Sequence, residues 1–219
     1  MKTLIIIAVV LASPLVARAQ NVNVAAVAND SNLMTVTTGI EYGFVASVGY
    51  TRALRVQDRQ LLVGGEASLA WAEADPSDFQ LSAGARMPIV DGSRWKLLGG
   101  LAAVVRGTDN DLGRFTTIAG DAALIGGRYA RRGFVAAELG IDTALTTHIT
   151  PSEMYRMTVF PGAKSGWYGE TGSMVRAGLQ GGVSFARYDI VLRAGRLLDT
   201  AGQAALMPIY GTLALDARW

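Results

Sequence analysis

Hydrophobic and polar residues alternate along most of this chain, and this is the pattern of strands with one apolar and one polar face. In one such segment, Val63 and Leu69 share the apolar face. Glu66 and Ser68 share the opposite face. The same alternation predicts strands over 44–54, 61–73, 79–89, 95–108, 115–130, 133–148, 173–186, 190–199 and 204–219. The sequence is therefore that of an all-β protein.

The connections between these segments alternate in character. Short ones such as "DGSR" and "ARR" alternate with longer, Gly-, Pro- and Asp-rich ones such as "TDNDLGR" and the stretch 149–172. Short turns at one end and long loops at the other are typical of antiparallel up-and-down transmembrane barrels, which have an even number of strands. One more strand is therefore expected before Tyr42, in either "VNVAAVAN" or "LMTVTTGIEY". We predict about ten strands, with eight as the alternative if two segments merge.

The apolar face is the one that we expect to contact lipid. The polar face combines small residues with occasional charges, which makes a poor hydrophobic core but a suitable interior for a narrow barrel. A soluble barrel would have the opposite arrangement. The last strand, read backwards in steps of two from Trp219, has Ala217, Leu215 and Leu213 on one face. This face is expected to lie against the membrane.

The N-terminus has the features of a cleaved signal peptide. Lys2 precedes an apolar stretch over 4–16, and Ala17-Arg18-Ala19 forms an A-x-A cleavage site. We expect a signal peptide over 1–19 and a barrel over 20–219, with a long extracellular loop near 149–172. The chain has no Cys, which excludes disulfides. Its net charge of +2 and the lack of a basic stripe give no reason to expect a nucleic-acid partner.

Aromatic residues near strand ends predict two girdles at the membrane interfaces. The outward aromatic residues assigned to them are Tyr50, Trp71, Phe79, Trp95, Phe185 and Trp219. Trp71 and Phe79 flank the loop "ADPSD" at the expected extracellular rim, and the others fall at the periplasmic rim. An indole or phenol ring is stable where one end is apolar and the other is wet. Trp219 is therefore expected to anchor the barrel, with its carboxylate in the periplasm.

The chain resembles small bacterial outer-membrane β-barrel proteins in three features: the signal peptide, the alternating strands over 44–219 and the aromatic C-terminus. The resemblance is to the class and not to any one member. It implies an integral outer-membrane location, with outer-membrane lipid and lipopolysaccharide around the barrel. It also implies that the C-terminal strand is recognised by the barrel-assembly machinery.

Some charged residues fall on the polar face of the alternation, which is expected to point inward, and among them acidic and basic residues are equal in number. They are Glu41, Glu66, Asp121, Glu138, Asp142 and Asp216 against Arg86, Lys96, Arg106, Arg176, Arg193 and Arg218. Buried charges persist only when they are paired, because desolvation is otherwise unfavourable. The favoured interpretation is a set of ion pairs that fills a narrow barrel. The alternative is a polar path for small solutes.

The longest loop contains the residues that most suggest catalysis. His148 is the only His of the chain, and it shares inward parity with Glu138 and Asp142. With Ser152 and Glu153 it would supply the base, nucleophile and acid of a lipid hydrolase. Outer-membrane lipid A deacylases and phospholipases use such groups, but their His-x-Ser type of spacing is not met here. We therefore favour a rim His with no catalytic role.

The remaining motifs point to no cofactor. The aromatic stretch at 167–169, with Tyr155 and Phe160 beside Arg156 and Lys164, is expected to fold over the barrel mouth as a lid, the alternatives being a ligand site or a contact with lipopolysaccharide phosphates. Glycine-rich segments lie inside strand patterns and not at strand-to-helix turns, and a single His gives no metal site. Three hypotheses remain: a structural or surface-interaction barrel, a channel for small or apolar solutes, and a lipid A or phospholipid-modifying enzyme that uses His148.

Overall fold

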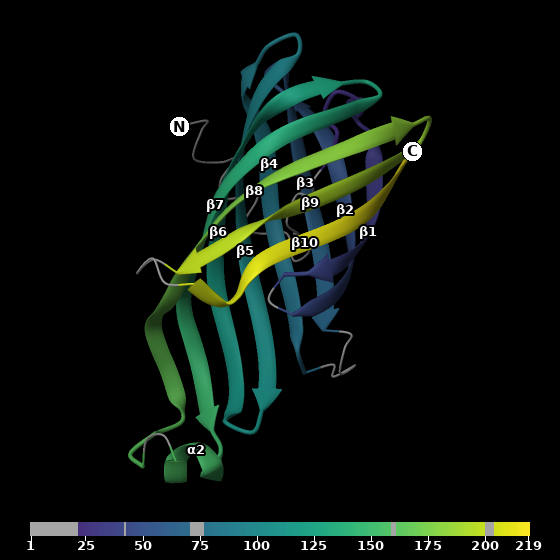
Figure 1. Cartoon of the computed structure of the whole chain (residues 1–219). Helices are drawn as coiled ribbons and strands as arrows, with labels where there is room; N and C mark the ends of the chain where they lie inside the picture. The colour runs from purple at the N-terminus through teal and green to yellow at the C-terminus, as the bar shows by residue number, and fades with distance from the viewer. Residues whose placement is uncertain (1–21, 42, 71–76, 159–160, 200–203) are drawn as a thin grey trace.

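The computed structural model describes residues 22–219 apart from 42, 71–76, 159–160 and 200–203. These residues form a closed antiparallel β-barrel of ten strands (Figure 1). The strands are β1 (Asn32–Ile40), β2 (Phe44–Val56), β3 (Arg59–Ala70), β4 (Phe79–Asp91), β5 (Trp95–Asn110), β6 (Gly113–Ala130), β7 (Gly133–Pro151), β8 (Gly166–Phe185), β9 (Tyr188–Asp199) and β10 (Ala204–Arg218). The short helix α2 (Glu153–Thr158) lies between β7 and β8.

Each strand pairs with its sequence neighbours, and β1 pairs with β10 to close the barrel. The predicted all-β, up-and-down barrel of ten strands is confirmed, and the alternative of eight strands is wrong. The strand expected before Tyr42 is β1, which lies in the second of the two candidate segments. The expected signal peptide, 1–19, lies outside the described residues.

The hairpin of β7 and β8 is longer than the alternation predicted. Pairing continues from Thr146 to Ile149 on β7 against 166–169 on β8. Thr146, Thr147 and Thr150 are β-branched and favour an extended chain. Much of the stretch expected as a loop, 149–172, therefore belongs to strands. No helix among the described residues is long and apolar enough to cross a membrane.

The two ends of the barrel differ in length and shape. At the turn end, β2–β3, β4–β5, β6–β7 and β8–β9 are joined by short turns, and the C-terminus lies there too (Figure 1). Gln57 and Asp58 both have positive φ, 49° and 65°, as a two-residue type I′ hairpin turn requires. At the opposite end, the hairpin end, β5 to β8 extend beyond the other strands and α2 lies at their tip (Figure 1). The barrel thus has short turns at one end and a projecting wall at the other.

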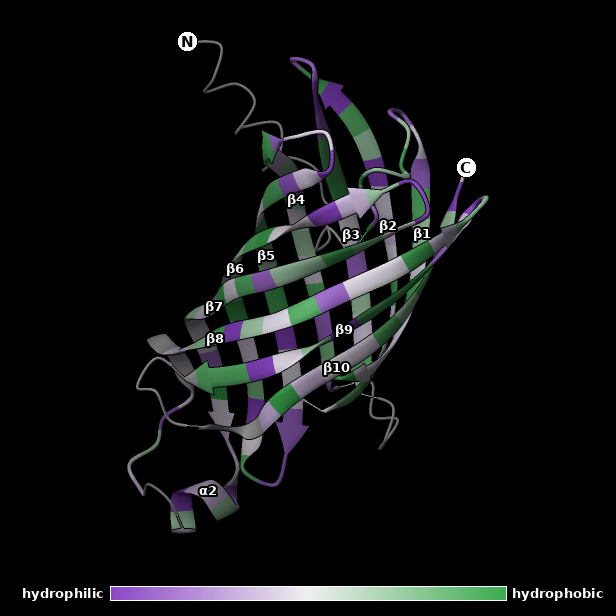
Figure 2. Cartoon of the chain, turned by 45° about the horizontal axis from the view of Figure 1, so that its top comes forward, coloured by the Kyte–Doolittle hydropathy of each residue, from purple (hydrophilic) through white to green (hydrophobic). Residues whose placement is uncertain are grey.

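The outer surface of the whole barrel is apolar. Large aliphatic side chains such as Leu101, Leu139 and Leu192 are more than half exposed. Figure 2 shows how hydrophobic and hydrophilic residues alternate along the strands. The inner positions carry the buried polar side chains, among them Asp121, Glu138 and Arg193. An apolar outside and a polar inside are what a membrane-spanning barrel requires.

Candidate functional site: the barrel lumen and the outer grooves

The turn end of the lumen is filled by the chain itself. The segment 22–27, which precedes β1, lies inside the barrel with Val22, Val24 and Val27 buried. These side chains join one hydrophobic cluster with inward residues of the wall, which include Leu33, Leu62, Leu98, Ile125, Tyr129, Phe134 and Val191. The rings of Tyr129 and Phe134 stack at 5.2 Å within it. We call this cluster the apolar plug.

Hydrogen bonds fix the plug segment to both sides of the barrel. The Asn23 side-chain amide donates to the carbonyl oxygen of Ala130 and to Ser184 Oγ, each at 2.8 Å. The Gln60 amide donates to the carbonyl oxygen of Val27 at 2.9 Å. Arg218 donates to the carbonyl oxygen of Ala26. Since these partners lie on different strands, the segment is held across the lumen and not along one wall.

Nearer the hairpin end, arginine and carboxylate side chains form a network on the inner face of the barrel. Arg176 on β8 pairs with Asp121 on β6, and its Nε donates to Glu138 Oε1 on β7 at 2.6 Å. Arg193 on β9 donates from Nε to Glu138 Oε2 at 2.7 Å. Its Nη1 also donates to Glu41 Oε1 at 3.1 Å, and Glu41 is the residue that follows β1. Four of these five side chains are almost fully buried, so each charge depends on its partners.

A further ion pair lies beside the contacts of Arg176 and Arg193. Arg106 on β5 pairs with both carboxylate oxygens of Asp142 on β7, and its Nε donates to Gln80 Oε1 at 2.8 Å. The guanidinium of Arg193 also lies over the ring of Tyr210, 4.7 Å from its centre. We use the name ionic layer for Arg106, Asp121, Glu138, Asp142, Arg176 and Arg193. It joins β5 to β9, and through Glu41 it reaches β1.

Gly140 explains how Arg176 reaches two carboxylates. It lies on the inner face of β7, where an added Cβ would be 2.6 Å from the guanidinium carbon of Arg176. The guanidinium can therefore lie flat against the wall only because this position has no side chain. The sequence marked this glycine as part of a strand but gave no sign of its partner.

The other inward charges of the sequence prediction lie closer to the turn end. Arg218 pairs with Asp189 at 3.1 Å, and Asp216 accepts a hydrogen bond from Thr35. Lys96 pairs with Asp91 at the end of the neighbouring strand β4, and Glu66 is half buried on the inner face of β3. Arg86 is buried on β4. Asp189 was missed because its sequence, "RYD", was interpreted as a turn.

Beyond the ionic layer, the hairpin end contains a polar cavity of about 300 Å³. Its lining includes Glu41, Ser68, Asp78, Gln80, Arg106 and Thr108. Thr108 donates to Asp78 at 3.2 Å, and Arg106 belongs to the ionic layer. The cavity is thus a recess at one mouth and not a passage between the two ends.

His148 lies on the outer face, contrary to the predicted inward parity. The register of β7 shifts between Ala144 and Thr146, which makes Leu145 an extra residue relative to β6. Such a bulge reverses the face of every residue that follows it. Thr147 therefore points inward, where its hydroxyl lies 2.9 Å from that of Thr117. His148 packs its ring edge against the exposed Trp167, with 5.2 Å between ring centres.

The other two residues of the hydrolase hypothesis form a helix start. Ser152 Oγ accepts a hydrogen bond from the backbone N–H of Tyr155 at 3.1 Å and donates to the carbonyl oxygen of Asp111 at 2.6 Å. This makes Ser152 the N-cap of α2. Glu153 is exposed in the first turn of that helix. The structure thus does not bring His148, Ser152 and Glu153 together as base, nucleophile and acid.

The segment expected as a lid does not fold over the barrel mouth. Residues 166–169 pair with the end of β7, and α2 lies at the tip of the projecting wall (Figure 1). Tyr168 and Trp167 are exposed there. The cause is that pairing between the threonine-rich end of β7 and β8 satisfies the backbone of both strands, so the chain continues outward. Phe160 lies outside the described residues.

Most of the predicted girdle residues lie on the outer face. Tyr50, Trp95, Phe185 and Trp219 are exposed near the turn end. Tyr50 and Trp219 face each other with their ring centres 6.5 Å apart. Phe79 begins β4 towards the hairpin end, and Trp71 lies outside the described residues.

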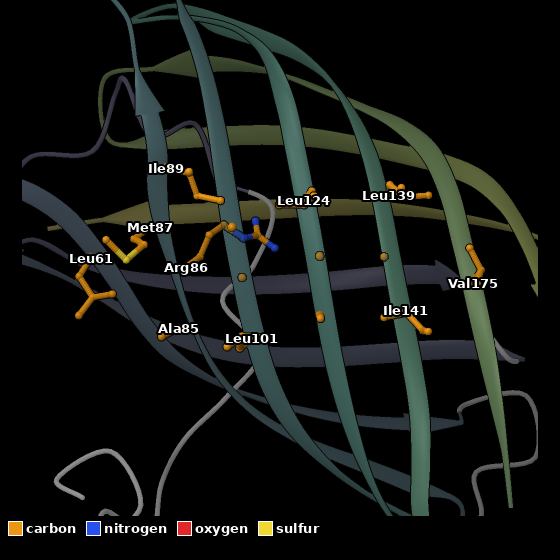
Figure 3. A pocket seen from close by; sticks show the side chains of 15 residues that line it. Leu61, Ala85, Arg86, Met87, Ile89, Leu101, Leu124, Leu139, Ile141 and Val175 are labelled. Atoms are coloured by element: carbon orange, nitrogen blue, oxygen red, sulfur yellow. The ribbon is translucent and has the colours of Figure 1, made fainter. Parts of the chain in front are cut away.

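Two shallow grooves cross the outer face. One, of about 670 Å³, spans β3 to β8 and is lined by apolar residues such as Met87, Gly99 and Leu101 (Figure 3). The other, of about 720 Å³, spans β1 to β4 and includes Tyr50 and Arg52. Within the described ranges no group of three or more His, Cys, Asp or Glu residues is placed to hold a metal ion.

No protein-family model matches the chain, and no curated protein matches it by sequence. Among solved structures, the β domain of the Bordetella autotransporter BrkA matches with 13% identity and a TM-score of 0.37, over 88% of this chain and 99% of that one. A bacterial polysaccharide outer membrane secretin matches with 9% identity and a TM-score of 0.26, over the same shares. At these values neither match carries an argument. The closed ten-stranded antiparallel barrel with an apolar outside is itself the architecture of a bacterial outer-membrane β-barrel.

Proposed function

We propose that this chain is an integral outer-membrane protein with a closed lumen, and that its role is structural or interactive at the cell surface. One observation carries the proposal: the lumen is filled at two levels, by the apolar plug and by the ionic layer. A porin leaves a continuous aqueous channel, whereas here wall and N-terminal side chains occupy the interior. An open pore therefore has less support than a closed barrel. A lipid hydrolase has less support because His148, Ser152 and Glu153 are not brought together.

The two ends suit the two sides of such a membrane. Short turns of outer-membrane barrels lie in the periplasm and longer loops lie outside. In this orientation the turn end, with Trp219, faces the periplasm, where the C-terminal strand is accessible to the assembly machinery during insertion. The projecting wall of β5 to β8 then stands above the lipopolysaccharide.

The tip of the wall has the properties of a contact surface. Met154 and Met157 on α2 are exposed, as is Trp167 on β8. Arg156 lies on the same helix, and Arg114 at the start of β6 pairs with Asp109. Exposed apolar side chains gathered beyond the membrane are a common feature of interaction sites, which supports an interactive role for this wall.

Orientation can be tested with trypsin on intact cells. Arg156 and Lys164 at the wall tip should be cleaved, whereas Arg131 and Arg132 in the β6–β7 turn should be cleaved only after the outer membrane is permeabilised. Mass spectrometry of the released peptides identifies the sites. Cleavage of the turn sites first would reverse the orientation.

Closure can be tested by liposome swelling. Vesicles that contain the folded protein should swell in arabinose no faster than protein-free vesicles, and a general porin serves as the positive control. Swelling at a porin-like rate would overturn the closed lumen.

A further inference from the structure

An arginine lies on the lipid-facing side of the barrel. Arg52 is exposed on β2, where Tyr50 and Leu54 share its outward parity. A charged side chain on this face is unfavourable unless it reaches the interface or an anion. Within the part of the chain that the structure describes, Arg52 forms no ion pair and no hydrogen bond through its side chain. Its partner must therefore come from the surroundings.

An apolar groove begins beside this arginine. Arg52, Tyr50 and Val48 line it from β2, and Leu81 lines it from β4. Between them, Gly65 and Ala67 on β3 form a low floor, because Tyr50 pairs with Gly65 and Val48 pairs with Ala67 across β2 and β3. The groove thus runs along β3 away from the guanidinium. Its shape suits one extended hydrocarbon chain.

The arginine end of the groove lies at the level of the membrane interface. Tyr50 donates from its hydroxyl to Asn32 Oδ1 at 2.7 Å, and its ring faces that of Trp219. Aromatic residues with one polar end mark the headgroup level. The turn end is the periplasmic end in the proposed orientation, so Arg52 lies at the headgroups of the periplasmic leaflet.

We propose that this groove is a binding site for an anionic phospholipid of the periplasmic leaflet. The phosphate pairs with the Arg52 guanidinium, which offers a planar fork of donors. One acyl chain lies over Gly65 and Ala67. The charge of Arg52 selects the anionic headgroup, and the groove holds the chain. This inference rests on the proposed membrane location.

The second groove supplies an internal comparison. Its volume is similar, about 670 Å³, and Arg86 is the charged residue in its lining. The Arg86 side chain, labelled in Figure 3, is buried. This second groove is therefore apolar and has no outward-facing cation. It should accept acyl chains of any phospholipid without preference for the headgroup.

Quenching of Trp219 by brominated lipids measures binding at the site. The three other Trp residues are replaced by Phe, and the protein is inserted into vesicles of phosphatidylcholine with increasing dibrominated phosphatidylglycerol. Dibrominated phosphatidylcholine gives the reference series. We expect phosphatidylglycerol to be preferred about five-fold, the factor that one arginine near an anionic headgroup provides. Arg52→Gln should reduce this preference to about one.

Three control variants separate the site from the general charge of the rim. Arg128→Gln removes an exposed cation from β6 at the same end and should leave the preference unchanged. Ala67→Leu fills the groove and should weaken quenching by both lipids, whereas Gly99→Leu fills the other groove and should not.

A preference near one in the parent protein, or equal losses with Arg52→Gln and Arg128→Gln, would overturn the inference. The heat-modifiable gel shift of the same vesicles shows insertion, so a barrel that fails to insert contradicts the membrane location instead.

Discussion

The two closures of the lumen are built from different parts of the chain. At the turn end, the apolar plug includes a separate segment, 22–27, that enters the barrel and packs against wall residues such as Leu62 and Ile125. Nearer the hairpin end, the ionic layer consists only of side chains from the wall itself. We therefore expect that the segment 22–27 can leave without breaking the barrel, whereas the ionic layer helps to hold the strands in register.

The energetics of the two closures differ accordingly. An apolar side chain that loses its contacts returns to water at the cost of its transfer energy. A buried charge that loses its partner stays in a medium of low polarity, and removal of one partner is strongly destabilising. We therefore expect the ionic layer to be the more sensitive of the two.

The largest effect is expected for Arg176→Met. This change leaves Asp121 without its bidentate partner and removes one of the two arginines from Glu138. The free energy of unfolding should fall by roughly 3–5 kcal/mol. Urea unfolding in detergent, followed by tryptophan fluorescence, measures it. Arg114→Met, which breaks the exposed pair with Asp109, should change it by less than about 1 kcal/mol. Similar losses for both would contradict a special role of the ionic layer.

A smaller effect is expected for Val24→Asp in the plug. The carboxylate cannot remain in the hydrophobic cluster, so the segment should leave the lumen and the free energy of unfolding should fall by about 3 kcal/mol, the value of one or two buried valines. Ala28→Asp, at the exposed position directly after the segment 22–27, is the control. Proteolysis of the N-terminal segment should increase only for Val24→Asp. If the whole barrel failed to form, the plug would be as essential as the ionic layer.

The turn end also contains the expected assembly signal. Trp219→Asp should lower the yield of folded barrel in cells, whereas Trp219→Phe should keep most of it, because an aromatic ring remains at the interface. Refolding of both purified variants in detergent separates assembly from stability. Equal cellular yields would show that this residue is not recognised.

The smallest effect is expected for His148→Ala at the hairpin end. His148 contacts Trp167 on the outside and has no contact with Ser152, so stability should change by less than about 0.5 kcal/mol. Mass spectra of lipid A and phospholipids from expressing cells should be unchanged. Loss of an acyl chain that depends on both His148 and Ser152 would restore the hydrolase hypothesis.

Alternation along the strands was sufficient to predict the barrel, because the period-2 pattern decides which face meets lipid. It also assigned Glu138 and Arg176 to the inner face. It did not reveal that they pair, since parity gives the face of a residue but not its register against a neighbouring strand. The pairings of the ionic layer follow from that register.

Two local features escaped the sequence pattern for physical reasons. The bulge at Leu145 leaves no trace in a threonine-rich stretch, and it moved His148 to the outer face. The segment "VNVAAVAN" alternates like a strand, but its apolar side packs inside the lumen and not in the wall. Alternation shows that a segment has an apolar side and does not show what that side contacts.

The closed lumen is tested most directly by conductance across planar bilayers. The protein is added from detergent at a protein-to-lipid ratio at which the gel shift shows folded, inserted barrel, and detergent alone is the control. If the lumen is closed, the current will be no higher than that of the control at either polarity. Steady, stepwise conductance in proportion to inserted protein would contradict it, because ions would then be passing both the apolar plug and the ionic layer.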